Sequence, residues 1–315
     1  MIPDVSVIMT VYNGEKYLAE AIESVLNQSF IEFEFIIVND CSTDASLSII
    51  ESYQDNRIII INNEVNLGLS KSCNLAIRYA RGSVIVRMDS DDICFANRLQ
   101  VQYQYLTDHP EIILLGTNAD IIDMNGAFIY TTDLPQNDLE IKESLNFRST
   151  FIHPTVAFRK SFFDKAGGYY EPIKHYFEDF ILWNQFAKLG KFKILPQSLL
   201  QYRIVMNSIS TKATTKGYKS LERIIAKRGY AEEQELAYII KEKANQGTIK
   251  NAEEAYYLIL AKNLLFKNYN PVLARKKLAI LFKKNRLSIK GIIYLSLSFL
   301  PKKFLDSLYQ SFKKQ

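Results

Sequence analysis

The sequence predicts an α/β protein with a mostly parallel central sheet flanked by helices, followed by a helical C-terminal region. Up to about residue 100, short apolar runs rich in β-branched residues alternate with segments whose apolar residues recur at helical spacing. This is the pattern of consecutive βαβ units. Residues 1–210 hold 17 Lys and Arg against 26 Asp and Glu, whereas residues 211–315 hold 22 against 8. We therefore expect two domains with different electrostatic roles, residues 1–212 and residues 213–315.

The composition is that of an ordinary globular protein. The chain has 315 residues, of which 48% are hydrophobic and 23% charged, which excludes collagen-like, coiled-coil and wholly disordered chains. Three cysteines without a CxxC pair and three scattered histidines predict neither a disulfide scaffold nor a zinc site, and indicate a reducing compartment. The N-terminus has no basic segment followed by an apolar stretch, so we expect no signal peptide.

Local patterns predict each element of the first hundred residues. Apolar runs of strand length predict strands, and the segments between them carry apolar residues three and four positions apart, which predicts helices. The expected strands are Val5–Thr10, Phe33–Val38, Arg57–Ile61 and Ser83–Arg87. The expected helices cover Leu18–Leu26, Ala45–Tyr53 and Leu69–Ala80, the second of them with Thr43 or Asp44 as its N-cap.

The next hundred residues extend this sheet. Asn125-Gly126, between the apolar runs Ala119–Ile122 and Ala127–Thr131, predicts a hairpin. One helix is expected from about Asp179 to Leu189. Further strands are expected at Ile112–Thr117, Thr155–Arg159, Lys191–Leu195 and Leu199–Ile204.

Polar residues collect where the predicted strands end. Ligands of open α/β sheets bind at the carboxyl ends of the strands, and the fourth strand ends in Asp89-Ser90-Asp91-Asp92. Three carboxylates in four residues exceed what capping the next helix requires, and such oxygen ligands suit Mg²⁺ or Mn²⁺. The GxGxxG, GxxxxGK[ST] and GxSxG motifs are absent, which counts against a dinucleotide site, a P-loop and a hydrolase nucleophile elbow.

At these residues the sequence resembles the family 2 inverting glycosyltransferases of the GT-A fold, of the type found in bacterial polysaccharide synthesis. The matches run in order over roughly residues 4–210: VSVIMTVYNGEKYLAEAIESVLNQSF, FEFIIVNDCSTDAS, NEVNLGLSKSCNLAI, ARGSVIVRMDSDDI, HPTVAFRKSFFDKAGGY and HYFEDFILWNQFAKLG. The ordered set is far more specific than any one segment. The resemblance implies a GT-A nucleotide-sugar-binding domain over residues 1–212.

The resemblance also implies roles for individual residues. Asp179 matches the catalytic base, and Asp89 and Asp91 match the DxD pair that holds the metal. Asp40 would accept a hydrogen bond from a uracil ring nitrogen. The full set of matches is Thr10, Tyr12, Asp40 and Asp89 at the nucleotide, and Gly168, Glu178 and Trp183 near the donor sugar or the acceptor. The helical spacing of its neighbours leaves a core position for Trp183 as the alternative.

Two histidines in this region are interpreted as structural. His153 precedes Pro154 and is taken as a turn residue, because nothing near it in the sequence pairs with it. His175 lies one helical turn before Asp179 and could orient that carboxylate, although we expect it at the surface. Val205 stands where many relatives carry a histidine near the metal.

The implied function is the transfer of one sugar, with inversion, from a nucleotide-diphosphate sugar to a saccharide or lipid-linked saccharide in cell-surface polysaccharide synthesis. The donor would carry uridine diphosphate, and the cofactor would be Mn²⁺ or Mg²⁺. Inversion needs one base that deprotonates the acceptor hydroxyl. The absence of the QxxRW motif of processive relatives favours a single transfer. Two alternatives stay open, a sugar-phosphate nucleotidyltransferase and a non-catalytic, membrane-docked nucleotide or carbohydrate binder.

The basic C-terminal region suggests a membrane surface as a partner. The run Gly291–Leu300 is too short to span a bilayer. The apolar residues after it recur at helical spacing opposite lysines, which favours a helix lying on an anionic surface: Phe304, Leu305, Leu308, Tyr309 and Phe312. This predicts a cytoplasmic protein, peripheral at the inner face of the cell membrane. A helical subdomain packed on the catalytic domain is the alternative, and no nucleic-acid partner is expected.

Overall fold

The computed structural model describes residues 3–146, 149–172, 177–206, 252–284 and 288–313. Two compact units can be distinguished among these residues. The first comprises residues 3–119 and 132–202, and the second comprises residues 120–131, 203–206 and the helices after residue 251. The division into residues 1–212 and 213–315 stays a prediction. His175 lies outside the described residues.

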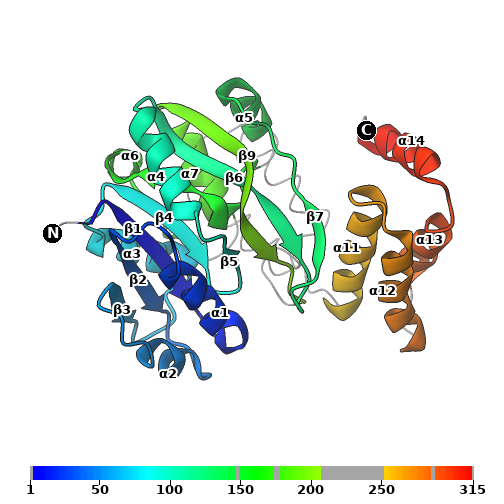
Figure 1. The fold of residues 1–315 in the computed structure, drawn as a ribbon, viewed down its shortest axis with the longest axis horizontal. Coiled ribbons are helices and arrows are strands. Elements are labelled where there is room, and N and C mark those ends of the chain that lie inside the picture. Colours follow the sequence, from blue (N-terminus) through cyan, green and yellow to red (C-terminus); the bar gives the residue numbers. More distant parts are fainter. Residues whose placement is uncertain (1–2, 147–148, 173–176, 207–251, 285–287, 314–315) are drawn as a thin grey trace. The chain divides into compact units, whose positions relative to one another are not determined.

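The first unit contains most of a nine-stranded sheet (Figure 1). The strands are β1 (Val5–Val11), β2 (Phe33–Asn39), β3 (Ile58–Asn62), β4 (Val84–Asp89), β5 (Ile93–Cys94), β6 (Ile112–Ile122), β7 (Phe128–Thr131), β8 (Ala157–Arg159) and β9 (Lys191–Arg203). Their order is β3-β2-β1-β4-β8-β6-β9-β5, with β7 paired to β6. The first four strands are parallel, as the βαβ pattern predicts, whereas β8 is antiparallel to both of its neighbours.

Helices cover both faces of this sheet (Figure 1). They are α1 (Glu15–Leu26), α2 (Ser46–Glu51), α3 (Leu69–Tyr79), α4 (Arg98–Asp108), α5 (Asp138–Leu145), α6 (Lys160–Ala166) and α7 (Glu178–Phe186). Because strand side chains alternate between faces, Val7 and Met9 pack with α1, α2 and α4, whereas Ile8 and Ile36 pack with α3, α5, α6 and α7. The predicted α/β architecture is therefore confirmed, with one hydrophobic core on each side of the sheet.

Two pairs of strands that the sequence predicts as separate are each one continuous strand in the structure. The segments expected as Ile112–Thr117 and Ala119–Ile122 form the single strand β6, because the buried polar side chains between them are satisfied internally. Asn118, for example, donates from Nδ2 to the Pro196 carbonyl at 3.0 Å. The segments expected as Lys191–Leu195 and Leu199–Ile204 likewise form one strand, β9, in which Pro196 is exposed.

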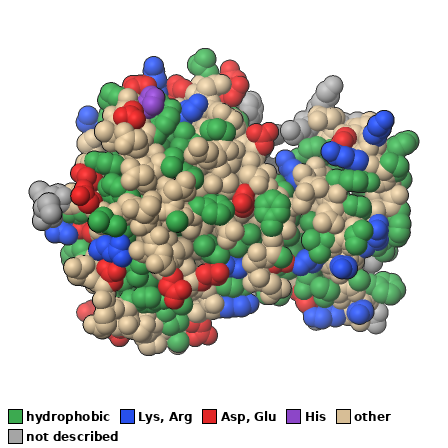
Figure 2. Space-filling model, viewed as in Figure 1, with side chains coloured by type: hydrophobic (Ala, Val, Ile, Leu, Met, Phe, Trp, Pro, Cys, Tyr) green, Lys and Arg blue, Asp and Glu red, His purple; other side chains and the backbone are tan. Residues whose placement is uncertain are grey.

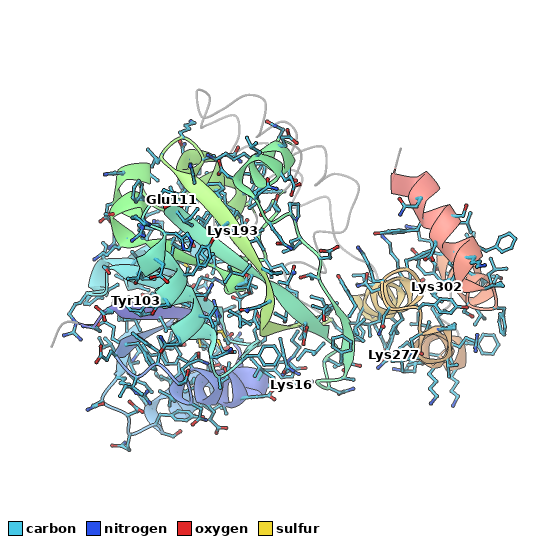
Figure 3. All side chains as sticks on the ribbon, turned by 45° about the horizontal axis from the view of Figure 1, so that its top comes forward. Lys16, Tyr103, Glu111, Lys193, Lys277 and Lys302 are labelled. Carbon is cyan, nitrogen blue, oxygen red and sulfur yellow. The ribbon has the colours of Figure 1, made fainter. Side chains whose placement is uncertain are left out.

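The second unit consists of the end of the β6–β7 hairpin and the helices α11 (Ala252–Phe266), α12 (Pro271–Lys283), α13 (Ile289–Leu297) and α14 (Lys302–Lys313). Lys277, labelled on α12 in Figure 3, donates to the buried Asp123 of the hairpin at 2.5 Å. Burial alone would raise the pKa of the Asp123 carboxyl, but Lys277 and two backbone amides lower it below its ordinary value. Tyr256 on α11 accepts a hydrogen bond from the Met124 amide at 3.0 Å. The hairpin end thus belongs to the helical unit.

The apolar face predicted for α14 is only partly free. Leu305 is buried, and Tyr309 stacks on Phe266 of α11 with ring centroids 5.6 Å apart. Phe304, by contrast, is 64% exposed. The helix therefore uses part of its apolar face to pack within the second unit, rather than presenting all of it to a membrane. None of the described helices combines the length and the apolar composition that crossing a bilayer requires.

Candidate functional site

The candidate site lies at the carboxyl ends of three neighbouring parallel strands of the first unit. Thr10 near the end of β1 is in register with Val38 of β2 on one side and with Asp89 of β4 on the other. The chain runs from β1 outward through β2 and β3, and then returns to the opposite side of β1 with β4. Such a reversal of strand order opens a crevice where ligands of α/β sheets bind. The topology thereby brings Thr10, Asp40 and Asp89 to one edge.

An acidic loop follows β4. Oxygen atoms of Asp89, Asp91 and Asp92 all lie within 4.8 Å of one another. The first two side chains are partly exposed and the third is buried. Clustered carboxylate oxygens are ligands that Mg²⁺ and Mn²⁺ prefer, and the partial exposure leaves room for a ligand to share the ion. The donor set therefore fits a divalent metal.

Two buried arginines support this loop. Arg87, only 3% exposed, forms an ion pair with Asp89. Arg98, fully buried at the start of α4, donates from Nη2 to the Arg87 carbonyl at 2.8 Å and from Nη1 to Cys94 Sγ at 3.2 Å. A buried guanidinium with several fixed donors restrains the backbone that it binds. Sequence reasoning missed both residues, because an isolated arginine in a strand or at a helix start carries no recognisable pattern.

Asp40 organises the neighbouring loop. It is 4% exposed, and its Oδ1 accepts hydrogen bonds from Asn63 Nδ2 at 2.7 Å and from the Leu67 amide at 2.8 Å. Its Oδ2 accepts one from the Gly68 amide at 2.9 Å. A carboxylate can accept about four hydrogen bonds, so Oδ2 retains capacity for one more donor. The carboxylate shapes its own loop, and its predicted contact with uracil stays a prediction.

The residues after β1 are held by the loop that follows β2. Asn13 has a positive φ of 52° and accepts a hydrogen bond through its side chain from the Thr43 amide at 2.8 Å. This arrangement leaves the Tyr12 side chain 54% exposed at the rim of the site. Thr10 is partly buried and hydrogen-bonds Cys73, whose thiol pKa burial raises to about 12. Tyr12 is thus available to a flat ligand, whereas Cys73 is an inert filler.

The carboxylates of Glu178 and Asp179 begin helix α7. Phe177, just before them, adopts the left-handed conformation with φ 64°, which turns the chain into the helix. Asp179 accepts hydrogen bonds from the Phe180 amide at 2.7 Å and from Ser149 Oγ at 3.0 Å. Burial, together with the neighbouring Glu178, raises the pKa of Asp179 above its ordinary value. A carboxyl whose pKa moves toward neutrality is better suited to general-base chemistry.

His153 is not the unpaired turn residue that the sequence suggested. Its Nε2 lies 2.7 Å from Tyr169 Oη, and its Nδ1 lies 3.6 Å from Glu178 Oε1. Tyr169 and Glu178 come from segments that follow His153 by many residues, so no local pattern could reveal these contacts. The negative charges of Asp89 and Asp179 both act to raise the pKa of this imidazole, although burial and Arg87 lower it overall. Asp89 and Asp179, 90 positions apart in the sequence, therefore both lie near this imidazole.

Gly168 shapes the turn that places Tyr169. Its φ is +78°, and a Cβ at this position would lie 3.0 Å from Asn74 Oδ1. That oxygen accepts a hydrogen bond from the Tyr169 amide at 2.9 Å, and Asn74 Nδ2 donates to the Tyr169 carbonyl at 2.8 Å. Only glycine combines this backbone conformation with such a close approach. The predicted contact of Gly168 with the donor sugar stays untested, whereas its conformational role is evident.

Trp183 is the one predicted site residue that the structure removes from the ligand surface. Its side chain is fully buried. The ring packs against Phe151, Phe158, Phe186 and the edge of His153, with centroid distances of 5.6–6.2 Å. A sugar cannot contact a ring with no exposed area, so the core position left open by the sequence is correct. Within this core, Trp183 packs against the ring of His153.

Comparisons with known proteins identify the family of the chain. The family model described as glycosyl transferase family 2 matches residues 6–167. The O-antigen biosynthesis glycosyltransferase WbnJ of Escherichia coli is 34% identical over 66% of this chain and 83% of its own length. WfgD of Escherichia coli, named as a UDP-Glc:α-D-GlcNAc-diphosphoundecaprenol β-1,3-glucosyltransferase, is 29% identical over 70% of this chain and 83% of its own length.

Solved structures show the same fold. Residues 1–349 of TarS from S. aureus, crystallised with UDP-GlcNAc, align with a TM-score of 0.58 at 20% identity, covering 98% of this chain and 91% of that one. The longer TarS chain aligns with a TM-score of 0.54, and 53% of its length is covered. The chain therefore has a GT-A fold and belongs to glycosyltransferase family 2.

Proposed function

We propose that this protein transfers one sugar, with inversion, from a UDP-sugar to a saccharide or lipid-linked saccharide acceptor in cell-surface polysaccharide synthesis. The observation that supports the proposal is that the acidic residues at the end of β4 and the raised-pKa carboxyl of Asp179 both interact electrostatically with His153. The names of WbnJ and WfgD support the acceptor class. The family match also argues against the alternative of a nucleotidyltransferase.

In this proposal Asp89 and Asp91, with Asp92 beside them, would hold Mn²⁺ or Mg²⁺. When bound, such an ion neutralises the charge that develops on a leaving diphosphate. The chain's own contribution is to keep the carboxylates together before the ligand arrives. Arg87 does this by pairing with Asp89, because it offsets part of the repulsion among three clustered acids.

The nucleotide would lie over the ends of β1 and β2. The exposed ring of Tyr12 offers a stacking surface for the base. The remaining acceptor position on Asp40 Oδ2 would accept a hydrogen bond from a donor such as the uracil ring nitrogen. Thr10 would line the same pocket.

The acceptor hydroxyl would lose its proton to Asp179 as it attacks the anomeric carbon. The two hydrogen bonds to this carboxylate fix its orientation without consuming its capacity to accept a proton. Glu178, next to it, is buried and directed toward His153, and Gly168 sets the turn on the other side of that histidine. Asp179 would therefore act alone as the base.

The second unit would supply contact with an anionic membrane surface. Helix α13 exposes Ile289, Ile292 and Ile293 on one face, with exposed fractions of 79%, 53% and 49%. Figure 2 shows basic (Lys and Arg) and hydrophobic side chains interleaved over the C-terminal helices. Because an apolar face among lysines suits an anionic bilayer, changing Ile292 and Ile293 to Asp should reduce co-sedimentation with phosphatidylglycerol vesicles. Val65→Asp, at an exposed apolar position of the first unit, is the control, and equal sedimentation of all proteins would refute this role.

The function is tested by incubating the full chain with UDP-glucose, UDP-galactose and UDP-GlcNAc in the presence of Mn²⁺. We expect at least one of these donors to release UDP, faster when an undecaprenyl-diphosphate-linked sugar is added. GDP-mannose serves as the control for the base. A chain that binds UDP but releases none from any donor, with or without acceptor, would instead be a non-catalytic binder.

A further inference from the structure

His153 connects two parts of the site that are distant in sequence. Its Nε2 is 2.7 Å from the hydroxyl of Tyr169, which follows the Gly167-Gly168 turn. Its Nδ1 is 3.6 Å from Glu178 Oε1 at the start of α7. The side chain is about one-tenth exposed, and its ring stands edge-on to Trp183 at a centroid distance of 5.9 Å. Protein groups therefore surround the imidazole and limit its rotation.

The groups around His153 favour one of its two neutral tautomers. Burial raises the pKa of Tyr169 well above its ordinary value, so the phenol keeps its proton. Burial, together with the charge of Arg87, lowers the pKa of His153 to about 3, so the imidazole is neutral near pH 7. The phenol can donate to Nε2 or accept from it. The acidic Oε1 of Glu178, 3.6 Å from Nδ1, favours the first arrangement, because it attracts a proton on Nδ1 and repels a lone pair there. The single imidazole proton is left on Nδ1, directed toward the Glu178 carboxylate.

We propose that neutral His153, as the Nδ1–H tautomer, is a positioning residue that hydrogen-bonds Tyr169 through Nε2 and attracts the Glu178 carboxylate through Nδ1–H. It ties the glycine turn to the start of α7 and leaves Asp179 as the carboxylate that meets the acceptor. The consequence for turnover rests on the proposed glycosyl transfer, whereas the tautomer does not. The charged and titratable groups around the ring are Arg87, Asp89, Tyr169, Glu178 and Asp179.

The tautomer can be measured without any substrate. The chain has only three histidines, and the spectrum of His153→Gln identifies the signals of His153 in a long-range ¹H–¹⁵N correlation experiment. We expect the Nδ1–H pattern, unchanged between about pH 5 and pH 9, whereas an ordinary histidine titrates near pH 6.5. An Nε2–H pattern, or titration near pH 6.5, would overturn the proposal. Tyr169→Phe removes only the hydroxyl and should allow Nε2–H to appear; an unchanged tautomer there would also overturn it.

Turnover separates positioning from mere packing. Asn at position 153 places its amide near Nδ1 and can still donate to Glu178, whereas Gln reaches toward Nε2 and Tyr169. With the UDP-sugar that releases UDP, we expect His153→Asn to keep kcat within about threefold and His153→Gln to lose about 10- to 100-fold, with KM for the donor unchanged in both. Equal rates in both variants would refute the positioning role.

The two possible failures remain distinguishable. If the wild-type chain releases UDP from no donor, the proposed function fails and the tautomer result still stands on its own. If the wild type is active and both variants match it, the inference about His153 fails. If thermal unfolding shows that His153→Gln does not fold, Tyr169→Phe replaces it in the comparison with His153→Asn. Loss of the phenol lets the proton move from Nδ1 to Nε2 and so weakens the contact with Glu178. Tyr169→Phe must then show the loss of kcat.

Discussion

Replacing Asp179 with Asn changes the proton-accepting capacity of the site with little change in shape. The Asn carbonyl oxygen can still accept the hydrogen bond from the Phe180 amide, which is 2.7 Å long in the native structure. The new amide group can donate to Ser149 Oγ, which now lies 3.0 Å from Oδ2. Because both hydrogen bonds have a replacement, we expect the free energy of unfolding to change by less than about 1 kcal/mol.

The rate of sugar transfer should fall far more. Loss of a positioned general base lowers rates by about 10²- to 10⁴-fold, which corresponds to about 3–5 kcal/mol of activation free energy. Donor binding should survive, because Asp89 and Asp91 lie on the loop after β4. Burial raises the pKa of Asp179, so kcat/KM of the wild type should decline with acidification at a pH above the ordinary aspartate value. This acid limb should be absent from the residual activity of Asp179→Asn.

The assay is UDP release with acceptor, measured against pH, together with calorimetric titration of UDP. Asp164→Asn, at an exposed position on α6, is the matched control and should behave as the wild type. Transfer by Asp179→Asn within about threefold of the wild type would refute the assignment of the base. Equal loss of UDP binding and transfer would instead show that Asp179 acts through the structure of the site.

Three further substitutions test the packing within the two units. Gly168→Ala should destabilise the fold by about 1–2 kcal/mol more than Gly167→Ala, because both have positive φ but only the former meets a close neighbour; equal melting temperatures would contradict this. Trp183→Phe should lower the free energy of unfolding by about 1–3 kcal/mol without changing the preference among UDP-sugars, since the ring is buried. A changed preference would show that Trp183 contacts the sugar after all. Lys277→Ala should cost about 3 kcal/mol in urea unfolding by leaving a buried carboxylate unpaired, whereas the exposed Lys276→Ala should cost little; similar unfolding of the two would contradict the buried pair.

The sequence predicted the parallel half of the sheet well, because its strands are continuous apolar runs. It failed where inward-facing positions are polar. Helix α4 buries Arg98 and Gln102, which hydrogen-bond each other at 3.0 Å, so its core-facing side shows no hydrophobic periodicity. Strand β6 buries Asn118, the polar residue that separated the two predicted strands. In both cases hydrogen bonds replace apolar contact, and residue type alone does not reveal them.

The candidate site was predictable where its residues are dense in the sequence. Asp89 and Asp91 stood out because carboxylates repeat within four positions, and the family resemblance supplied Asp179. His153 and Arg87 were missed, since their partners come from separate segments and only the fold brings them together. Trp183 shows the reverse case, in which the family resemblance suggested a position near the sugar but its neighbours on α7 place it in the core.

The acidic loop should bind the donor's diphosphate only with the help of a divalent metal. Calorimetric titration of UDP into the full chain, in Mn²⁺ and then in EDTA, tests it together with Asp91→Ala and the control Asp164→Ala. We expect binding in Mn²⁺ for the wild type and the control, and its loss in EDTA and in Asp91→Ala, because the carboxylate cluster alone repels the diphosphate. Equally tight UDP binding by Asp91→Ala, or by the wild type in EDTA, would contradict the account.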